Sequence, residues 1–423
     1  MRFTSLDQWL DWQSSLHSRT IDLGLERVRQ AWTSLGAPLL APTVITIAGT
    51  NGKGSTVAIL EAILLAAGYR VGAFTSPHLL RYNERIRLHG QPVSDQAICD
   101  SFARIDAARG DTSLTYFEFG ALAAFDIFQQ ANLDVALLEV GLGGRLDAVN
   151  LIDADVAVVT TIALDHVDWL GSTREAIAAE KFGVGRPGKP LVFGDSHPPS
   201  NVEALAIERG VTLYRIGRDF AFRHADDSWV WSNAQLARTA LPYPRLRGAF
   251  QLANASCALQ ALALLAERLP VTQNDARAGL LDAAVPGRFQ VFTGKPIRVL
   301  DVAHNPESAQ SLAGNLARFE PMLPKIAVLG MLKDKDMLGV ISPLLGCIDR
   351  WYVGGIAAER GATGEAVRGA LVAAGVPADQ IDCSESIGEA YERACEAAEA
   401  AVVVVFGSFY TVAHALKQIQ GDN

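Results

Sequence analysis

A short glycine-rich segment between an apolar run and a helical pattern constrains this chain most. Residues 43–48 are apolar and β-branched, as in a buried strand, and residues 56–68 place apolar side chains at helical spacing. The segment between them has the glycines and lysine of a phosphate-binding loop, in which backbone N–H groups and a helix N-terminus meet an anion. It consists of Gly49, Thr50, Asn51, Gly52, Lys53, Gly54 and Ser55. This order of strand, loop and helix predicts that the chain binds ATP.

The loop departs from the usual spacing at two positions. A glycine normally lies five residues before the Gly-Lys pair, where this chain has Ile47, and a hydroxyl residue normally follows the lysine, where it has Gly54. The alternative interpretation is an ordinary glycine turn of a doubly wound sheet that carries a lysine by chance. The flanking strand and helix favour the phosphate-binding loop.

Length and charge limit the classes of function. A chain of 423 residues predicts two domains, and its net charge of -9 disfavours a nucleic-acid partner, which needs clustered cations. The five scattered cysteines form no C-x-x-C pair, so we expect neither zinc nor disulfides, and a cytoplasmic location. The first 12 residues do not resemble a signal sequence. Residues 248–266 contain glutamine and asparagine, which favours a buried helix over a membrane span.

Alternating strand and helix patterns predict an α/β fold. Continuous apolar runs such as residues 135–138 are typical of strands covered on both faces, hence of a mostly parallel sheet. Residues 213–241 show short alternating pieces, which predict a small antiparallel excursion. We therefore expect a large P-loop domain over residues 1–287 and a smaller C-terminal α/β domain over residues 288–423, with the active site in the cleft between the domains.

Polar residues follow three predicted strands of the large domain. Ser76, Glu139 and His166 each lie at the end of such a strand, where ligands collect in α/β sheets, and together they could hold Mg²⁺ beside the loop. Taken singly, the carboxylate is as often a loop-capping group, and the histidine is more often an ordinary hydrogen-bonded one. The prediction of a metal site therefore depends on all three converging.

Further candidate segments lie on both sides of the domain boundary. Residues 139–147 contain three glycines directly after a strand, so the backbone there can approach a ligand closely. Lys181 falls in a predicted helix, and by itself it is interpreted as a solvated surface lysine. In the smaller domain, residues 301–306 and 407–410 place polar groups at two strand ends, and Arg288 at the boundary could touch a nucleotide.

The chain as a whole resembles the Mur ligase superfamily of ATP-dependent amide-forming enzymes. Within it, the chain is similar to the family of bacterial bifunctional dihydrofolate synthase/folylpolyglutamate synthases, from about residue 16 to residue 416. The loop carries the first part of this resemblance. The further segments that carry it are residues 21–27, 76–79, 114–118, 139–148, 164–166, 286–289 and 301–306.

This resemblance implies roles residue by residue. The implied ATP contacts are Thr50, Asn51, Gly52, Lys53, Gly54, Ser55, Asn254, Arg288 and Asp301. Ser76, Glu139 and His166 would ligate Mg²⁺, with two ions expected and K⁺ a further candidate; Lys53 and His166 also have catalytic roles. Lys181 matches a lysine that is carbamoylated in the family and then helps to hold a second metal. The implied substrate contacts are Asp22, Leu23, Gly24, Leu25, Thr115, Tyr116, Phe117, Glu118, Leu146, Asp147 and Ala148 for the pterin, and His304 and Ser408 for glutamate.

The implied reaction forms an amide. ATP would convert the carboxylate of dihydropteroate, or the terminal carboxylate of a folate, into an acyl phosphate, which the amine of L-glutamate then attacks. The partners would be small molecules alone, and we expect a monomer without nucleic-acid or membrane partners. Two alternatives remain at this point. A peptidoglycan-precursor ligase usually carries an extra domain before the loop, which here begins at residue 49, and a non-catalytic ATP-dependent switch would not need the metal ligands.

Overall fold

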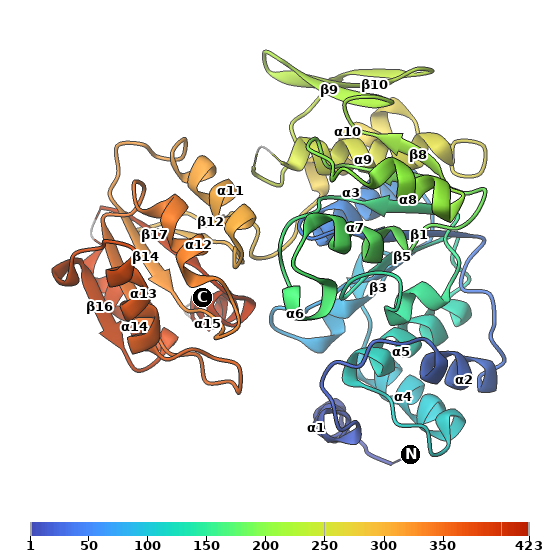
Figure 1. The fold of residues 1–423 in the computed structure, drawn as a ribbon, viewed down its shortest axis with the longest axis horizontal. Coiled ribbons are helices and arrows are strands. Elements are labelled where there is room, and N and C mark those ends of the chain that lie inside the picture. The colour runs from blue at the N-terminus through green and yellow to red at the C-terminus, as the bar shows by residue number, and fades with distance from the viewer. Residues whose placement is uncertain (1, 249, 399, 422–423) are drawn as a thin grey trace. The chain divides into compact units, whose positions relative to one another are not determined.

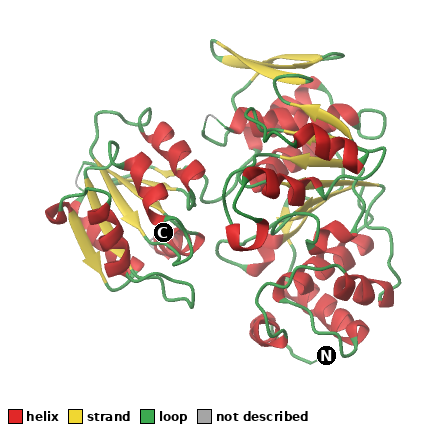
Figure 2. Cartoon of the chain, viewed as in Figure 1, coloured by secondary structure: helices red, strands yellow, loops and turns green. Residues whose placement is uncertain are grey.

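The computed structural model describes residues 2–248, 250–398 and 400–421. Two compact units are present, and each has helices on both sides of a largely parallel sheet (Figures 1 and 2). The predicted α/β class, with a mostly parallel sheet and a smaller C-terminal α/β domain, is thereby confirmed.

The N-terminal unit comprises Met1–Arg245 and Gln251–Ala284. Its main sheet has the strands β1 Thr43–Ala48, β2 Val71–Phe74, β3 Ile86–Leu88, β4 Gln91–Pro92, β5 Val135–Glu139, β6 Val156–Val159, β7 Pro190–Phe193 and β8 Thr212–Arg215. Their order is β4-β3-β2-β5-β1-β6-β7-β8. The pairs β2–β3 and β3–β4 are antiparallel, and the other pairs of this sheet are parallel. Strands β1 and β5 are buried along their whole length, as the continuous apolar runs predict.

Helices cover this sheet and form the rest of the unit's core. They are α1 Leu6–Leu16, α2 Glu26–Ser34, α3 Lys53–Ala66, α4 Asp95–Arg109, α5 Tyr116–Gln130, α6 Val167–Leu170, α7 Arg174–Phe182, α8 Val202–Arg209, α9 Gln251–Leu264 and α10 Gln273–Asp282, with short 3₁₀ turns η1 Tyr82–Arg85 and η2 Ala148–Leu151. Helix α3 begins at Lys53, three residues before the predicted start, because Gly52 in the left-handed region forms the N-cap and the first turn includes Gly54. Gly68 then ends the helix with a positive φ.

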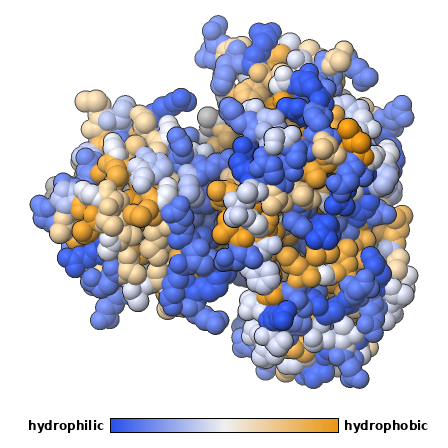
Figure 3. Space-filling model, viewed as in Figure 1, coloured by the Kyte–Doolittle hydropathy of each residue, from blue (hydrophilic) through white to orange (hydrophobic). Residues whose placement is uncertain are grey.

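The antiparallel excursion is a three-stranded sheet, and it is shorter than predicted. It contains β9 Phe220–Ala225, β10 Ser228–Asn233 and β11 Ala237–Leu241. The segment that begins the predicted excursion is β8, which extends the main sheet because it pairs in parallel with β7. The predicted buried helix is α9, and none of the helices in the described part of the chain is both long and apolar enough to cross a bilayer. On the face shown in Figure 3, hydrophobic side chains occur in small groups among hydrophilic ones.

The C-terminal unit comprises Leu246–Phe250 and Val285–Asn423. Its strands are β12 Gln290–Phe292, β13 Ile297–Leu300, β14 Lys325–Leu329, β15 Arg350–Gly354, β16 Ile381–Ser384 and β17 Val402–Phe406, in the order β12-β13-β17-β14-β15-β16. Only β12 is antiparallel to its neighbour. The helices are α11 Pro306–Leu316, α12 Met337–Ile341, α13 Gly364–Ala373, α14 Ile387–Ala397 and α15 Phe409–Gly421, with 3₁₀ turns η3 Ser342–Leu344 and η4 Ala378–Gln380.

Helix α10 packs on α3, the helix that follows the loop, and this packing depends on a glycine. A Cβ atom at Gly279 would lie 2.5 Å from the backbone N and Cα of Ile63.

We expect Gly279→Ala to lower the free energy of unfolding by roughly 1–3 kcal/mol, because backbone atoms would have to move. The control is Gly314→Ala in α11, where no atom lies within 4 Å of the added Cβ. It should stabilise the protein by about 0.5–1 kcal/mol, since alanine favours a helix more than glycine does. Thermal unfolding would measure the melting temperatures of both variants. Equal shifts of the melting temperature in Gly279→Ala and Gly314→Ala would contradict the steric explanation.

Candidate nucleotide and metal site

The loop after β1 needs glycine at two positions. Gly49 has a φ of +143°, and a Cβ atom there would overlap the hydroxyl of Thr160. Gly52 has a φ of +88°, and a Cβ atom there would overlap the side-chain oxygen of Asn254. Both the backbone conformation and the space therefore exclude larger residues. The loop leads directly into α3, and the N–H groups at a helix N-terminus form a place where an anion can bind.

Two lysines converge on the first carbonyl of the loop. The Nζ of Lys53 donates to the carbonyl oxygens of Gly49 (3.0 Å) and Thr50 (3.2 Å), and the Nζ of Lys181 donates to the same Gly49 oxygen at 2.9 Å. Lys181 is only 4% exposed. The interpretation of Lys181 as a solvated surface lysine is therefore wrong, because α7 turns this face inward. Burial, and then the nearby charge of Lys53, lower the pKa of Lys181 to about 7.

The segment after β6 supports the loop along its length. The backbone N–H of Thr50 donates to the Thr161 carbonyl (2.8 Å), and that of Asn51 donates to the Thr161 hydroxyl (3.2 Å). The Thr50 hydroxyl donates to the Ala163 carbonyl at 3.2 Å and accepts from the Ala163 N–H at 3.0 Å. The Thr160 hydroxyl donates to the Asn51 carbonyl at 2.6 Å. Thr50 and Asn51 thus have fixed orientations before any ligand binds.

The predicted metal ligands come from three strand ends. Glu139 ends β5 and is 4% exposed, and its Oε2 accepts the backbone N–H of Ser76 at 3.1 Å. A Cβ atom at Gly54 would lie 3.7 Å from the same oxygen, so this carboxylate lies beside the first turn of α3. Carboxylate and hydroxyl oxygens are the donors that Mg²⁺ prefers, so Glu139 and Ser76 fit such an ion.

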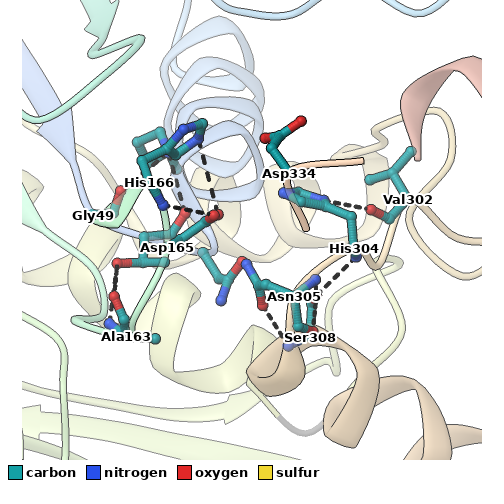
Figure 4. A network of polar contacts seen from close by, with 12 residues as sticks. Gly49, Ala163, Asp165, His166, Val302, His304, Asn305, Ser308 and Asp334 are labelled. Atoms are coloured by element: carbon teal, nitrogen blue, oxygen red, sulfur yellow. Dashed lines mark hydrogen bonds and ion pairs between the residues drawn. The ribbon is translucent and has the colours of Figure 1, made fainter. Parts of the chain in front are cut away.

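His166 lies on a separate turn, after β6. It has a φ of +51°, and its backbone N–H donates to Oδ1 of Asp165 at 2.9 Å (Figure 4). In residues 2–248, 250–398 and 400–421, no cluster of three or more His, Cys, Asp or Glu side chains is arranged to hold a metal ion. The predicted set includes a serine hydroxyl, and the roles of Ser76, Glu139 and His166 as metal ligands stay a prediction.

Helix α9 contributes two buried amides to the loop. Asn254 is packed against Gly52, and its Nδ2 donates to the Oε1 of Gln251 at 2.9 Å. The Nε2 of Gln251 donates in turn to the Ser55 hydroxyl at 3.4 Å. The predicted nucleotide residues Asn254 and Ser55 therefore meet at the same helix terminus. Gln251 completes this chain of contacts.

Comparisons with known proteins identify the family of the chain. The Mur ligase middle domain matches residues 47–262, and the Mur ligase glutamate ligase domain matches residues 287–409. The chain belongs to the Mur ligase family. It is 46% identical to the dihydrofolate synthase/folylpolyglutamate synthase of Escherichia coli K12 over 415 residues, which cover 98% of this chain and 95% of the relative.

Solved structures give the same result for this Mur ligase. E. coli FolC in complex with DHPP and ADP superposes with a TM-score of 0.94 at 45% identity, covering 99% of this chain and 98% of that one. A bifunctional folylpolyglutamate synthase/dihydrofolate synthase with Mn, AMPPNP and L-glutamate bound superposes with a TM-score of 0.91 at 45% identity, with the same coverage. These relatives bind a nucleotide, and one of them a divalent cation.

Arg27 joins the two N-terminal segments that are predicted to contact the pterin. Its guanidinium donates to Oδ2 of Asp22 at 2.6 Å and to Oε1 of Glu118 at 2.9 Å. Glu118 is buried and also accepts the backbone N–H of Thr115 at 2.7 Å, in the capping box that starts α5. Glu118 therefore has a structural role in this Mur ligase. The segment from Asp22 through Leu23 and Gly24 to Leu25 is irregular and partly buried.

The third predicted pterin segment follows β5. A Cβ atom at Gly141 would lie 2.5 Å from the Phe117 ring, so only glycine fits beneath this ring. Asp147 is buried and accepts backbone N–H groups of Gly141, Leu142 and Val149 at 2.9–3.0 Å. Burial raises the pKa of Asp147 to about 6 in spite of these bonds. Leu146 and Ala148 flank it, and Tyr116 packs against Tyr82.

The C-terminal unit gathers its predicted residues around two strand ends. Asp301, after β13, accepts the N–H groups of Phe289 (2.9 Å) and Ala303 (2.8 Å), and burial raises its pKa. The Nδ1 of His304 lies 2.8 Å from the Val302 carbonyl oxygen (Figure 4). The guanidinium of Arg288 lies 5.2 Å from the centre of the Phe409 ring, and the His304 ring lies 6.2 Å from it.

Ser408 lies two residues after β17, and its hydroxyl lies 2.7 Å from the Thr411 hydroxyl.

Four residues with contacts around the site are not among the predicted site residues, namely Thr160, Thr161, Gln251 and Phe409. Strand-end position was a usable signal for the threonines. None was available for Gln251, whose partner Ser55 is 196 residues distant.

Gly49→Ala should weaken nucleotide binding. The added Cβ would displace Thr160 and with it the bonds that shape the loop. If the overpacking cost of roughly 1–3 kcal/mol falls on the binding conformation, ADP affinity should fall about 5- to 150-fold. Gly188→Ala is the matched control, because Gly188 also has a positive φ but has no atom within 4 Å of its Cβ position. Calorimetric titration with ADP would measure both. Unchanged affinity in Gly49→Ala would contradict the steric requirement.

Proposed function

We propose that this Mur ligase joins L-glutamate to dihydropteroate, forming dihydrofolate, and to reduced folates, forming folylpolyglutamates. The observation that carries the proposal is the rigid phosphate loop with a buried carboxylate, Glu139, beside the first turn of α3. The near full-length similarity to dihydrofolate synthase/folylpolyglutamate synthase supports the choice of substrates.

Amide formation from a carboxylate and an amine needs an activated carboxyl group. The substrate carboxylate attacks the γ-phosphate of ATP, which yields an acyl phosphate and ADP. The neutral amine of L-glutamate then attacks the acyl carbon, phosphate leaves, and the amine loses a proton. The main catalytic requirement is stabilisation of the negative charge that gathers at the γ-phosphate.

The chain supplies this stabilisation from fixed groups. The N–H groups at the start of α3 and the ammonium of Lys53 would contact the phosphates. Thr50 and Asn51 are held in place by the segment after β6. Glu139, Ser76 and His166 would hold Mg²⁺, which when bound neutralises phosphate oxygens. Arg288, Asp301 and Asn254 would contact the nucleotide, and His304 and Ser408 the incoming glutamate.

Lys181 has the environment that a carbamoylated lysine requires. Only a neutral amine can attack CO₂, and burial shifts this lysine toward its neutral form. The product would be an anionic carbamate next to the loop, able to help hold a second Mg²⁺. K⁺ would be a further candidate ion. We also propose a monomer that acts in the cytoplasm, where its five free thiols would stay reduced.

The substrate assignment predicts turnover with a pterin. Purified protein with ATP, Mg²⁺, dihydropteroate and L-glutamate should release phosphate and form dihydrofolate in equal amounts, and a tetrahydrofolate acceptor should be extended by glutamate. A phosphate assay with chromatography of the product would measure this. Turnover with a UDP-muramoyl substrate and none with any pterin would contradict the assignment, and an absence of turnover with either would favour a switch.

The lysine modification predicts a specific loss and rescue. Lys181→Ala should lose activity that short carboxylates partly restore, because they replace the carbamate oxygens. With ¹³C-bicarbonate, the wild type should show a carbamate resonance that Lys181→Ala lacks. The control is Lys189→Ala, whose amine pairs with Asp155; it should keep both the activity and the resonance. Full activity of Lys181→Ala would rule the modification out as a requirement.

A further inference from the structure

An ion pair between a buried carboxylate, Asp195, and a partly exposed guanidinium, Arg174, contacts the segment that supports the nucleotide loop. Asp195 follows β7 and is 9% exposed, and its Oδ2 accepts from the Nη2 of Arg174 in α7 at 2.8 Å. The same Oδ2 accepts the backbone N–H of Ile162 at 3.1 Å, and the Nε of Arg174 donates to the Ile162 carbonyl at 2.7 Å. The pair therefore binds both polar backbone groups of Ile162.

The pair is itself anchored to the chain on its far side. Oδ1 of Asp195 accepts the N–H of His197 at 2.9 Å, and the Nη2 of Arg174 donates to the His197 carbonyl at 2.6 Å. The carboxylate and the guanidinium thus each have two or more partners, which fixes their orientation. A charged pair with satisfied partners holds a segment more firmly than a single neutral hydrogen bond does.

Ile162 lies between the residues that contact the nucleotide loop. Thr161, before it, bonds the N–H groups of Thr50 and Asn51, and Ala163, after it, exchanges two hydrogen bonds with the Thr50 hydroxyl. The chain then reaches His166 within four residues. A displacement of Ile162 would therefore move the support of the loop and the turn that carries a predicted metal ligand.

From this geometry we infer that Asp195 and Arg174 are positioning residues for the nucleotide and metal site, acting through Ile162. This inference rests on the proposed function only in that the loop binds a nucleotide. Partners that orient a binding segment from behind typically affect affinity by about 10-fold or more, although they do not touch the ligand.

The test is the affinity of the full chain for ADP and for Mn²⁺ with AMPPNP, measured by calorimetry without turnover. Asp195→Asn removes the charge and keeps the shape, and we expect it to weaken both affinities about 10-fold. Asp195→Glu retains the carboxylate and should restore part of the loss. Hydrogen exchange at the amides of residues 160–166 should be faster in Asp195→Asn than in the wild type.

The matched control is Asp134→Asn at the opposite end of the same sheet. Asp134 also accepts a backbone N–H (2.8 Å) and a guanidinium (2.7 Å), both from Arg70, but it lies where β2 and β5 begin. Asp134→Asn should lower the melting temperature of the protein and leave its affinities for ADP and for Mn²⁺ with AMPPNP unchanged. If Asp195→Asn lowers the melting temperature in the same way and binds both ligands within twofold of the wild type, the inference is overturned.

A milder variant covers the case in which Asp195→Asn does not fold. Arg174→Lys keeps the positive charge on a partly exposed side chain but loses the rigid planar fork, in which separate Nε and Nη2 atoms donate to Ile162 and to Asp195. Weaker ADP binding in this variant supports the inference, and wild-type affinity overturns it. A wild-type chain that binds no ADP would instead refute the proposed function, so the two failures are distinguishable.

Discussion

The nucleotide loop keeps its shape because the backbone pairing of β1 with β6 continues past the ends of both strands. The strands are in register to Ala48 and Val159. Beyond them, the N–H of Thr160 donates to the Ala48 carbonyl at 3.0 Å, and that of Thr50 donates to the Thr161 carbonyl at 2.8 Å. A loop that extends a central parallel ladder is held by the same kind of backbone hydrogen bonds as the sheet, so its N–H groups are oriented in advance for an anion.

Two lysines beside this loop explain how an acidic protein can bind a polyanion. The chain carries a net charge of -9, yet the Nζ atoms of Lys53 and Lys181 both donate to one carbonyl oxygen, that of Gly49. Burial lowers the pKa of Lys181 most, and the nearby charge of Lys53 lowers it further. The positive charge at this carbonyl therefore belongs mainly to the group that is not held in its neutral form by its surroundings.

Local features could be predicted from the sequence, whereas contacts across the chain could not. The order of strand, loop and helix around Gly52 depends on neighbouring residues, and α9 could be identified from the composition of residues 248–266. The burial of Lys181 depends on how α7 packs, and a helix with charged residues on several faces does not reveal which face turns inward. The contact of Thr50 with Ala163 joins residues 113 apart, so no local pattern encodes it. The sequence predicts the start of α3 three residues too late, because Gly54 and Ser55 are typical of loops.

Carboxylates at strand ends have two uses that residue type alone does not separate. Asp301 and Asp195, which follow β13 and β7, accept two backbone N–H groups each. Asp147, in the loop between β5 and η2, accepts three. Such a carboxylate fixes the loop that follows its strand. Glu139 also accepts a backbone N–H, from Ser76, but it lies against the N-terminal turn of α3. A carboxylate at that position is stabilised by the helix dipole. Because all these residues are carboxylates at or after strand ends, the packing around each one, and not its residue type, decides what it can contact.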